Sequence, residues 1–88
     1  MVALVADRDG EIVGAASLLT DGELIAYLAL LVVAEGHRRR GVAKRLVREL
    51  FARSGMTKMD LLSEERSTAF YESLPHRPKP GYRLYPES

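Results

Sequence analysis

The sequence predicts a single α/β (α+β) domain with a mixed, mostly antiparallel sheet and two helices. Two Asp-Gly turns, at residues 9–10 and 21–22, separate three apolar runs, which is the pattern of consecutive hairpins. The third run leads into an amphipathic stretch, and a short apolar run follows it, so a strand–helix–strand crossover is expected. With 88 residues, of which 47% are hydrophobic, the chain suits one domain with a small core.

The three predicted hairpin strands are residues 2–6, 11–19 and 23–33. The third of them is apolar on both faces, which predicts a position in the middle of the sheet with a layer on either side. Residues 41–53 are expected to be helical because apolar side chains recur there with a 3.6-residue period. Gly55 is typical of the position just past a helix end.

The second half of the chain predicts further strands and a second helix. Residues 58–63 are expected to form a strand parallel to the third one, and residues 82–85 alternate like an edge strand. Ser63 is the predicted N-cap of the second helix, which Pro75 would end. Four or five strands are therefore expected in total.

The turn between the third strand and the first helix carries three consecutive arginines, Arg38, Arg39 and Arg40, followed by Gly41. The first backbone N–H groups of a helix have no intrahelical partner, and the positive end of the helix dipole lies there too. Such a turn suits a phosphate or pyrophosphate. The alternative interpretation is a solvated basic face at a helix start.

Composition excludes several classes of site. The chain has no cysteine, so disulfides, thiolate nucleophiles and zinc–thiolate sites are excluded, and a reducing cytoplasmic location is expected. His37 and His76 belong to no ligand cluster, so no metal is predicted. No signal peptide is predicted, and the uncharged run ending at Ala34 is too short to span a bilayer, so no membrane partner is expected.

The motif Arg38-x-x-Gly41-x-Ala43 resembles the Gln/Arg-x-x-Gly-x-Gly/Ala signature of the GNAT acetyltransferases. Leu31-x-Val33-x-Glu35-x-His37-Arg38 is similar to the strand end that precedes this signature, and Phe70-Tyr71-Glu72-Ser73-Leu74 is similar to the family's late helix. The resemblance implies that residues 1–88 form one minimal acetyl-CoA-binding domain. It assigns the pyrophosphate of acetyl-CoA (CoA) to the turn, through Arg38, Arg39, Arg40, Gly41, Val42 and Ala43.

The same resemblance implies an N-acetyltransferase that moves the acetyl group to a primary amine, on a small molecule or a peptide, by direct attack in a ternary complex. The acetyl carbonyl would be polarised by backbone N–H groups of Leu31, Val32 and Val33, although a plain buried strand fits these residues equally well. Tyr71 would donate a hydrogen bond to the departing sulfur, or would simply pack beside Phe70. Ser67 is small where the cofactor arm should pass.

Three features depart from the family pattern or leave a role open. Glu64 stands where many members carry an Asn that contacts the cofactor arm, and Glu23, Asp60 and Glu64 are all candidates for the base. The usual first strand and first two helices are missing ahead of residue 2. Either the domain is minimal, with an open acceptor site, or a partner subunit supplies that wall.

Two alternative functions remain at the sequence level. One is a CoA-binding module without catalysis. The other is a nucleic-acid binder that uses a stripe of basic side chains, disfavoured by the net charge of only +1 and by the lack of interleaved aromatic residues. The stripe comprises Arg38, Arg39, Arg40, Lys44, Arg45 and Arg48. The small core and an exposed sheet edge are also compatible with a homodimer.

Overall fold

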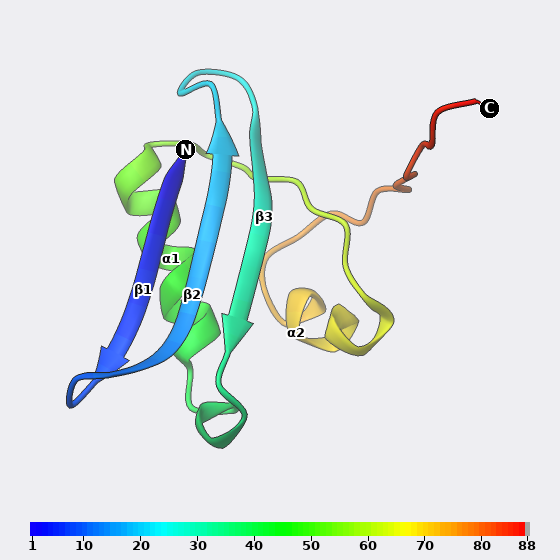
Figure 1. Cartoon of the computed structure of the whole chain (residues 1–88). Coiled ribbons are helices and arrows are strands. Elements are labelled where there is room, and N and C mark those ends of the chain that lie inside the picture. Colours follow the sequence, from blue (N-terminus) through cyan, green and yellow to red (C-terminus); the bar gives the residue numbers. More distant parts are fainter. Residues whose placement is uncertain (88) are drawn as a thin grey trace.

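A computed structural model describes residues 1–87. A three-stranded antiparallel sheet, ordered β1-β2-β3, is covered on one face by helix α1 (Figure 1). The strands are β1 (Val2–Arg8), β2 (Glu11–Thr20) and β3 (Ala26–Val33), and the helix is α1 (Val42–Ser54). The mixed, mostly antiparallel fold class is thus confirmed, as is the meander order of the first three strands.

The two predicted Asp-Gly turns join the strands. Asp9 and Gly10 both adopt positive φ angles, 53° and 84°, which closes the first hairpin. The second connection is wider, because the Oδ1 atom of Asp21 accepts hydrogen bonds from the backbone N–H groups of Glu23, Leu24 and Ile25 at 2.9 to 3.1 Å. This Asp21 loop shortens β3, which begins at Ala26 rather than at residue 23.

The core lies between the sheet and α1. Leu18 and Leu50 are fully buried at its centre, and no charged or polar side chain is buried among the described residues. Strand alternation directs Val2, Leu4 and Ala6 of β1 toward the same core. The main buried cluster comprises Ala16, Leu18, Ala26, Leu28, Leu46, Leu50 and Met56.

Gly14 brings the start of α1 close to the sheet. A Cβ atom on Gly14 would lie 3.0 Å from Cγ1 of Val42, 3.1 Å from the carbonyl oxygen of Val32 and 3.2 Å from Cδ1 of Leu46. The absence of a side chain at Gly14 therefore sets how near the helix N-terminus can approach β2 and β3.

Both ends of α1 are marked by glycines in the left-handed conformation. Gly41, with φ 81°, precedes the helix, and Gly55, with φ 72°, follows it and donates its N–H to the carbonyl of Phe51 at 3.0 Å. The predicted boundaries of this helix are correct to within one residue.

The predicted strand at residues 58–63 is wrong. Only Asp60 pairs with β3, in a parallel bridge to Tyr27, where the Leu28 N–H donates to the Asp60 carbonyl and the Asp60 N–H donates to the Ala26 carbonyl, both at 2.9 Å. The chain then leaves β3 and runs toward the second helix (Figure 1). The parallel direction expected from the crossover is present at this bridge, but the ladder does not continue.

Because this ladder stops, β3 is an edge strand of the sheet and the prediction of a mid-sheet position was wrong. Its side chains Leu30 and Val32 stay about half exposed. The predicted edge strand at residues 82–85 is also absent, since residues 75–87 have no regular secondary structure. Pro78 and Pro80 lack the N–H donors that a ladder requires.

The second helix begins later than predicted. It consists of a 3-10 turn, η2 (Glu65–Ser67), followed by the short helix α2 (Thr68–Glu72). Ser63 lies ahead of both and is not an N-cap, and Ser67 precedes α2 without a side-chain cap. No helix within residues 1–87 has the length and apolar character needed to cross a membrane.

Candidate active site

The arginine turn lies at the end of the sheet where β3 stops. A 3-10 turn, η1 (Glu35–His37), follows Val33, and Arg39 then adopts a positive φ of 65° before Gly41. In α1 the first intrahelical bond runs from the Arg45 N–H to the Gly41 carbonyl at 3.1 Å, and no side chain caps the helix start. The N–H groups of the first helical turn are therefore available to an external acceptor.

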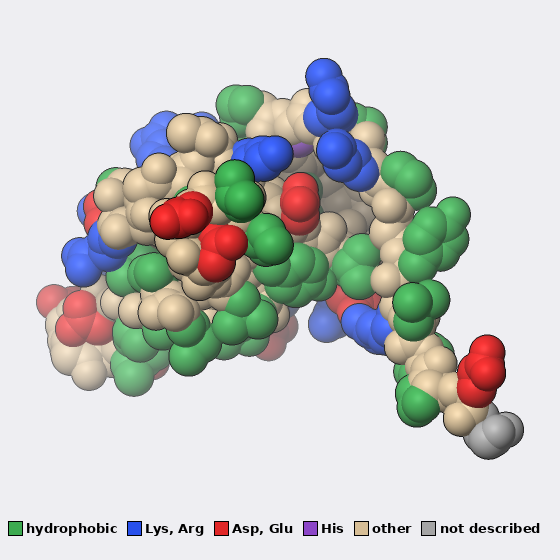
Figure 2. Space-filling view, turned by 90° about the horizontal axis from the view of Figure 1, so that it is seen from above, with side chains coloured by type: hydrophobic (Ala, Val, Ile, Leu, Met, Phe, Trp, Pro, Cys, Tyr) green, Lys and Arg blue, Asp and Glu red, His purple; other side chains and the backbone are tan. Residues whose placement is uncertain are grey.

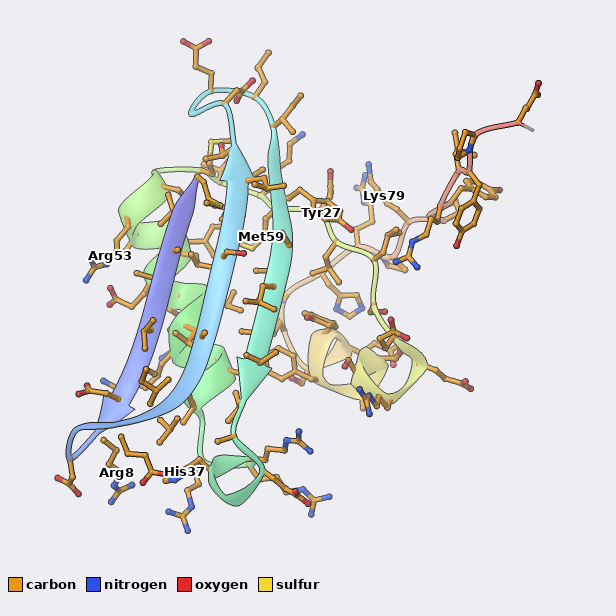
Figure 3. All side chains as sticks on the ribbon, viewed as in Figure 1. Arg8, Tyr27, His37, Arg53, Met59 and Lys79 are labelled. Atoms are coloured by element: carbon orange, nitrogen blue, oxygen red, sulfur yellow. The ribbon has the colours of Figure 1, made fainter. Side chains whose placement is uncertain are left out.

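Charge at this turn is concentrated and solvent-facing. Arg38, Arg39 and Arg40 are all exposed, and the side chains around His37 extend from the lower end of the sheet in Figure 3. Arg38 also donates from Nε to the Val33 carbonyl at 3.3 Å, which ties the turn to the end of β3. Exposed N–H donors, guanidinium groups and the positive helix end together fit a pyrophosphate.

A bulge alters β3 in the middle of the strand. Ser17 pairs with Leu30 whereas Leu18 pairs with Leu28, so Ala29 has no partner on β2. On the other edge of β3, Leu28 donates to Asp60 and the two segments then diverge. The backbone of β3 beyond the bulge thus faces an opening rather than a fourth strand.

The direction of the β3 donors follows from the ladder. The Ala34 N–H donates to the Val13 carbonyl at 2.8 Å, and antiparallel pairing alternates from there. The N–H of Val32 consequently points toward β2, whereas those of Leu31 and Val33 point toward the open edge. Two of the three predicted carbonyl-polarising donors thus face the opening.

A hollow of about 220 Å³ lies at this opening. One wall is β3, the other is the segment after Asp60, and the second helix closes it. The structure brings Leu31, Ser67 and Tyr71 together here, three residues predicted separately for the site. The full lining is Leu28, Ala29, Leu30, Leu31, Leu62, Ser63, Glu64, Ser67 and Tyr71.

Several of these lining residues were not predicted. Leu28, Ala29 and Leu30 were missed because a bulge leaves no clear signal in an apolar run, and Leu62 and Ser63 were assigned to a strand. Gly14 was also missed, although an isolated glycine inside a strand is a known sign of close backbone approach.

Tyr71 is partly buried at the base of the hollow. Its ring packs against the main core cluster and meets Phe70 edge to face, with centroids 5.1 Å apart. Burial raises the pKa of the Tyr71 phenol above its usual value of 10.0, because the charged form loses hydration. The phenol is therefore neutral at physiological pH and able to donate a hydrogen bond.

The three candidate bases have different surroundings. Glu64 lines the hollow, while Asp60 is exposed and uses its backbone to pair with β3. Glu23 lies in the Asp21 loop, at the other end of β3 from the arginine turn (Figure 1). Within residues 1–87 no group of three or more His, Asp or Glu side chains is arranged to hold a metal ion.

Residues 2–74 match the family model described as Acetyltransferase (GNAT) domain. Among solved structures, an aminoglycoside acetyltransferase from an uncultured soil metagenomic sample is 34% identical, with 98% of this chain aligned at a TM-score of 0.73. A Deinococcus radiodurans protein assigned to the acetyltransferases is 31% identical over 88% of this chain, with a TM-score of 0.78. No curated protein sequence shows significant similarity.

AAC(6')-Iy bound to the bisubstrate analogue CoA-S-monomethyl-acetylneamine shares the fold, with a TM-score of 0.78 over 98% of this chain at 20% identity. The present chain spans only part of these proteins. It covers 55% of the Deinococcus protein, 65% of the metagenomic enzyme and 68% of AAC(6')-Iy.

Proposed function

Because the chain belongs to the GNAT acetyltransferase family, we propose that it transfers an acetyl group from acetyl-CoA to a primary amine of a small molecule. The observation that carries this proposal is one continuous path along β3. It starts at the uncapped N-terminus of α1 and ends in the hollow that Tyr71 lines. A pyrophosphate donor site and an acyl site lie on the same strand edge.

The first step of the proposed mechanism is retention of the cofactor. The N–H groups of Val42 and Ala43 would bind the pyrophosphate, with Gly41 leaving room for its oxygens and Arg39 and Arg40 adding charge-assisted contacts. Arg38 has a second role here, because its bond to Val33 holds the turn against the strand. The chain therefore offers both donors and a fixed position for them.

The second step is polarisation of the thioester carbonyl. Main-chain donors that face an opening are preorganised, because the sheet fixes their direction before the substrate arrives. Leu31 and Val33 offer such donors on the edge of β3 that lies away from β2. Ser67 lines the same hollow with a small side chain, which leaves space for the cofactor arm.

The third step is attack and departure. The neutral amine forms a C–N bond to the acetyl carbon, the C–S bond breaks with its electron pair going to sulfur, and the amine proton passes to a base. Glu64 is the carboxylate of the hollow and is the proposed acceptor of that proton, directly or through water. The neutral Tyr71 phenol stabilises the departing thiolate by donating a hydrogen bond.

Calorimetric titration tests the cofactor assignment. Acetyl-CoA should bind, dephospho-CoA should retain most of the affinity, and a pantetheine that lacks the pyrophosphate should lose most of it. Absence of heat with acetyl-CoA at millimolar concentration would contradict the proposal. Release of free thiol in the presence of a panel of small amines then tests turnover.

A CoA-binding module without catalysis is the second candidate, and it is favoured by one observation. The chain spans only 55% to 68% of the three acetyltransferase structures described above, so parts of their acceptor sites have no counterpart here. Binding of acetyl-CoA with no thiol release for any amine would support this module. A salt-dependent shift of random DNA, without acetyl-CoA binding, would instead support the nucleic-acid alternative.

A further inference from the structure

One face of the sheet has no covering layer. Because side chains alternate along a strand, the residues that do not face α1 gather on the opposite side of the sheet. Neither helix of the chain crosses this side (Figure 1), and Figure 2 shows hydrophobic side chains gathered along it. We call it the open sheet face, and it comprises Ala3, Val5, Ala15, Ser17, Leu19, Leu30 and Val32.

The open sheet face is apolar and uncharged. Val5 is 61% exposed, Val32 50% and Leu19 48%, and none of the seven residues carries a charge. Monomeric proteins seldom leave a contiguous apolar surface of this kind to water, and such surfaces mark interaction sites. Three neighbouring strands contribute to it, so it is not a scatter of single side chains.

The amount of exposed surface indicates how much a partner could cover. The chain exposes 7390 Å², whereas a compact monomer of 9.8 kDa exposes about 5,200 Å². Its radius of gyration is 13.9 Å, compared with about 12 Å for a compact chain of this length. The extended segment after Pro75 explains part of the excess, and the open sheet face contributes the rest of the accessible apolar area.

We propose that the open sheet face is the interface of a homodimer, in which a second copy packs its own sheet against it. An excess of about 2,200 Å² per chain is ample for a stable interface, since standard interfaces bury about 800 Å² on each partner. The uncharged face has nothing to repel an identical face, and the net charge of +1 leaves little long-range repulsion between copies. A twofold axis through the sheet would form a two-layer sandwich.

Sedimentation equilibrium of the 88-residue chain over a wide concentration range tests this proposal. The chain should sediment at twice 9.8 kDa, with a measurable dissociation constant. Val5→Lys should yield monomers, because it places a charge inside the interface on a residue of β1 that is remote from the hollow. Ala52→Lys, which adds the same charge on the exposed side of α1, is the matched control and should remain dimeric.

A gentler variant covers the case in which Val5→Lys does not fold. Val5→Thr keeps the shape and strand propensity of valine, and it should raise the dissociation constant by about tenfold or more, because the change occurs twice in each dimer. A wild-type chain that stays monomeric up to millimolar concentration would overturn the proposal. Equal dimerisation of the wild-type, Val5→Lys and Val5→Thr chains would also overturn it, since the contact would then lie elsewhere.

Discussion

At the scale of single residues, Tyr71 connects the core of the protein to its proposed chemistry. Its ring is packed against the main cluster, while the residue also lines the hollow. Because burial raises its pKa, Tyr71 contributes stability fully below pH 10, and that contribution is lost as pH rises through the folded-state pKa. A tyrosine held in this way is suited to donate a hydrogen bond across the whole neutral range.

We expect Tyr71→Phe to lower kcat about 10- to 100-fold while leaving the dissociation constant of acetyl-CoA unchanged. The reason is that the phenol acts on the departing thiolate and not on the bound pyrophosphate. Steady-state kinetics and calorimetry measure the two quantities separately. Tyr85→Phe, in the exposed C-terminal segment, is the control and should match the wild type. An unchanged kcat in Tyr71→Phe would remove the assigned role.

Asp21 provides a second prediction at this scale. Hydrogen bonds from the N–H groups of Glu23, Ile25 and Leu24 lower the pKa of Asp21 below its usual 3.8. The stabilisation is therefore present above that value and is lost as pH falls through the lower folded-state pKa. Asp21→Asn should lose less stability than the wild type when the pH is lowered from about 5 to 2, a range set by the shift itself.

Urea unfolding at a series of pH values measures this difference. Glu23→Gln removes the same charge from the same loop without removing the acceptor of the three hydrogen bonds, so it is the matched control. Parallel acid profiles for Asp21→Asn and the wild type would show that the loop does not depend on the Asp21 carboxylate.

At the scale of elements, the start of α1 depends on glycines at two different places. Gly41 permits a left-handed turn with φ 81°, and Gly14 permits the helix to approach the sheet. The first was evident from the sequence because Gly41 follows three arginines at a predicted helix start. The second was not, because it depends on which residue of α1 lies over which residue of β2.

Gly41→Ala should weaken acetyl-CoA binding and destabilise the fold by about 1 kcal/mol, because alanine adopts the left-handed conformation poorly. Two other glycines separate these effects. Gly10→Ala carries the same backbone strain, with φ 84°, in the first hairpin, so it should lose similar stability with normal affinity. Gly36→Ala has an ordinary φ and open space, so it should change neither. Normal affinity in Gly41→Ala would contradict the pyrophosphate assignment.

Gly14→Ala should destabilise the protein by about 1–3 kcal/mol through overpacking against α1 and β3. Part of the crowding comes from the Val42 side chain, 3.0 Å from the added atom, and part from the Val32 carbonyl at 3.1 Å. Combining Gly14→Ala with Val42→Ala should recover some of the loss, which a double-mutant cycle of unfolding free energies measures. Strictly additive effects would show that Val42 is not the contact involved.

The same distinction explains which elements were predictable. Asp-Gly turns, the amphipathic period of α1 and the glycine after it are local signals, and the first three strands and α1 follow from them. The limits of pairing are not local. Residues 58–63 have the composition of a strand, but the chain turns from β3 after Asp60 toward α2. The hollow exists because this ladder stops, so its lining could not be predicted from the sequence.

At the scale of the whole molecule, a small core carries a large open surface. Nine hydrophobic residues are buried among those described, of which only Leu18 and Leu50 are large and fully enclosed. The predicted single domain with a small core thus agrees with the packing. A domain of this kind has a modest free energy of unfolding, so ligands and partners that bind only the folded state should change its stability visibly.

Acetyl-CoA at 100 times its dissociation constant should stabilise the folded chain by about 2.7 kcal/mol. For a domain of this size, that corresponds to a rise in Tm of about 10–20 °C. Calorimetry or circular dichroism during heating measures the shift, with pantetheine at the same concentration as the control that lacks the pyrophosphate. The protein concentration must be held fixed, because dimer formation also raises Tm.

The comparison of variants then assigns the gain in Tm to its source. Val5→Lys should remove the dependence of Tm on protein concentration and keep the acetyl-CoA shift, since Val5 lies on the open sheet face, away from the arginine turn. Gly41→Ala should do the reverse, because it alters the pyrophosphate site and leaves that face intact. If one variant abolished both effects, the cofactor site and the open sheet face would be coupled, and the acetyl-CoA site would require the second copy.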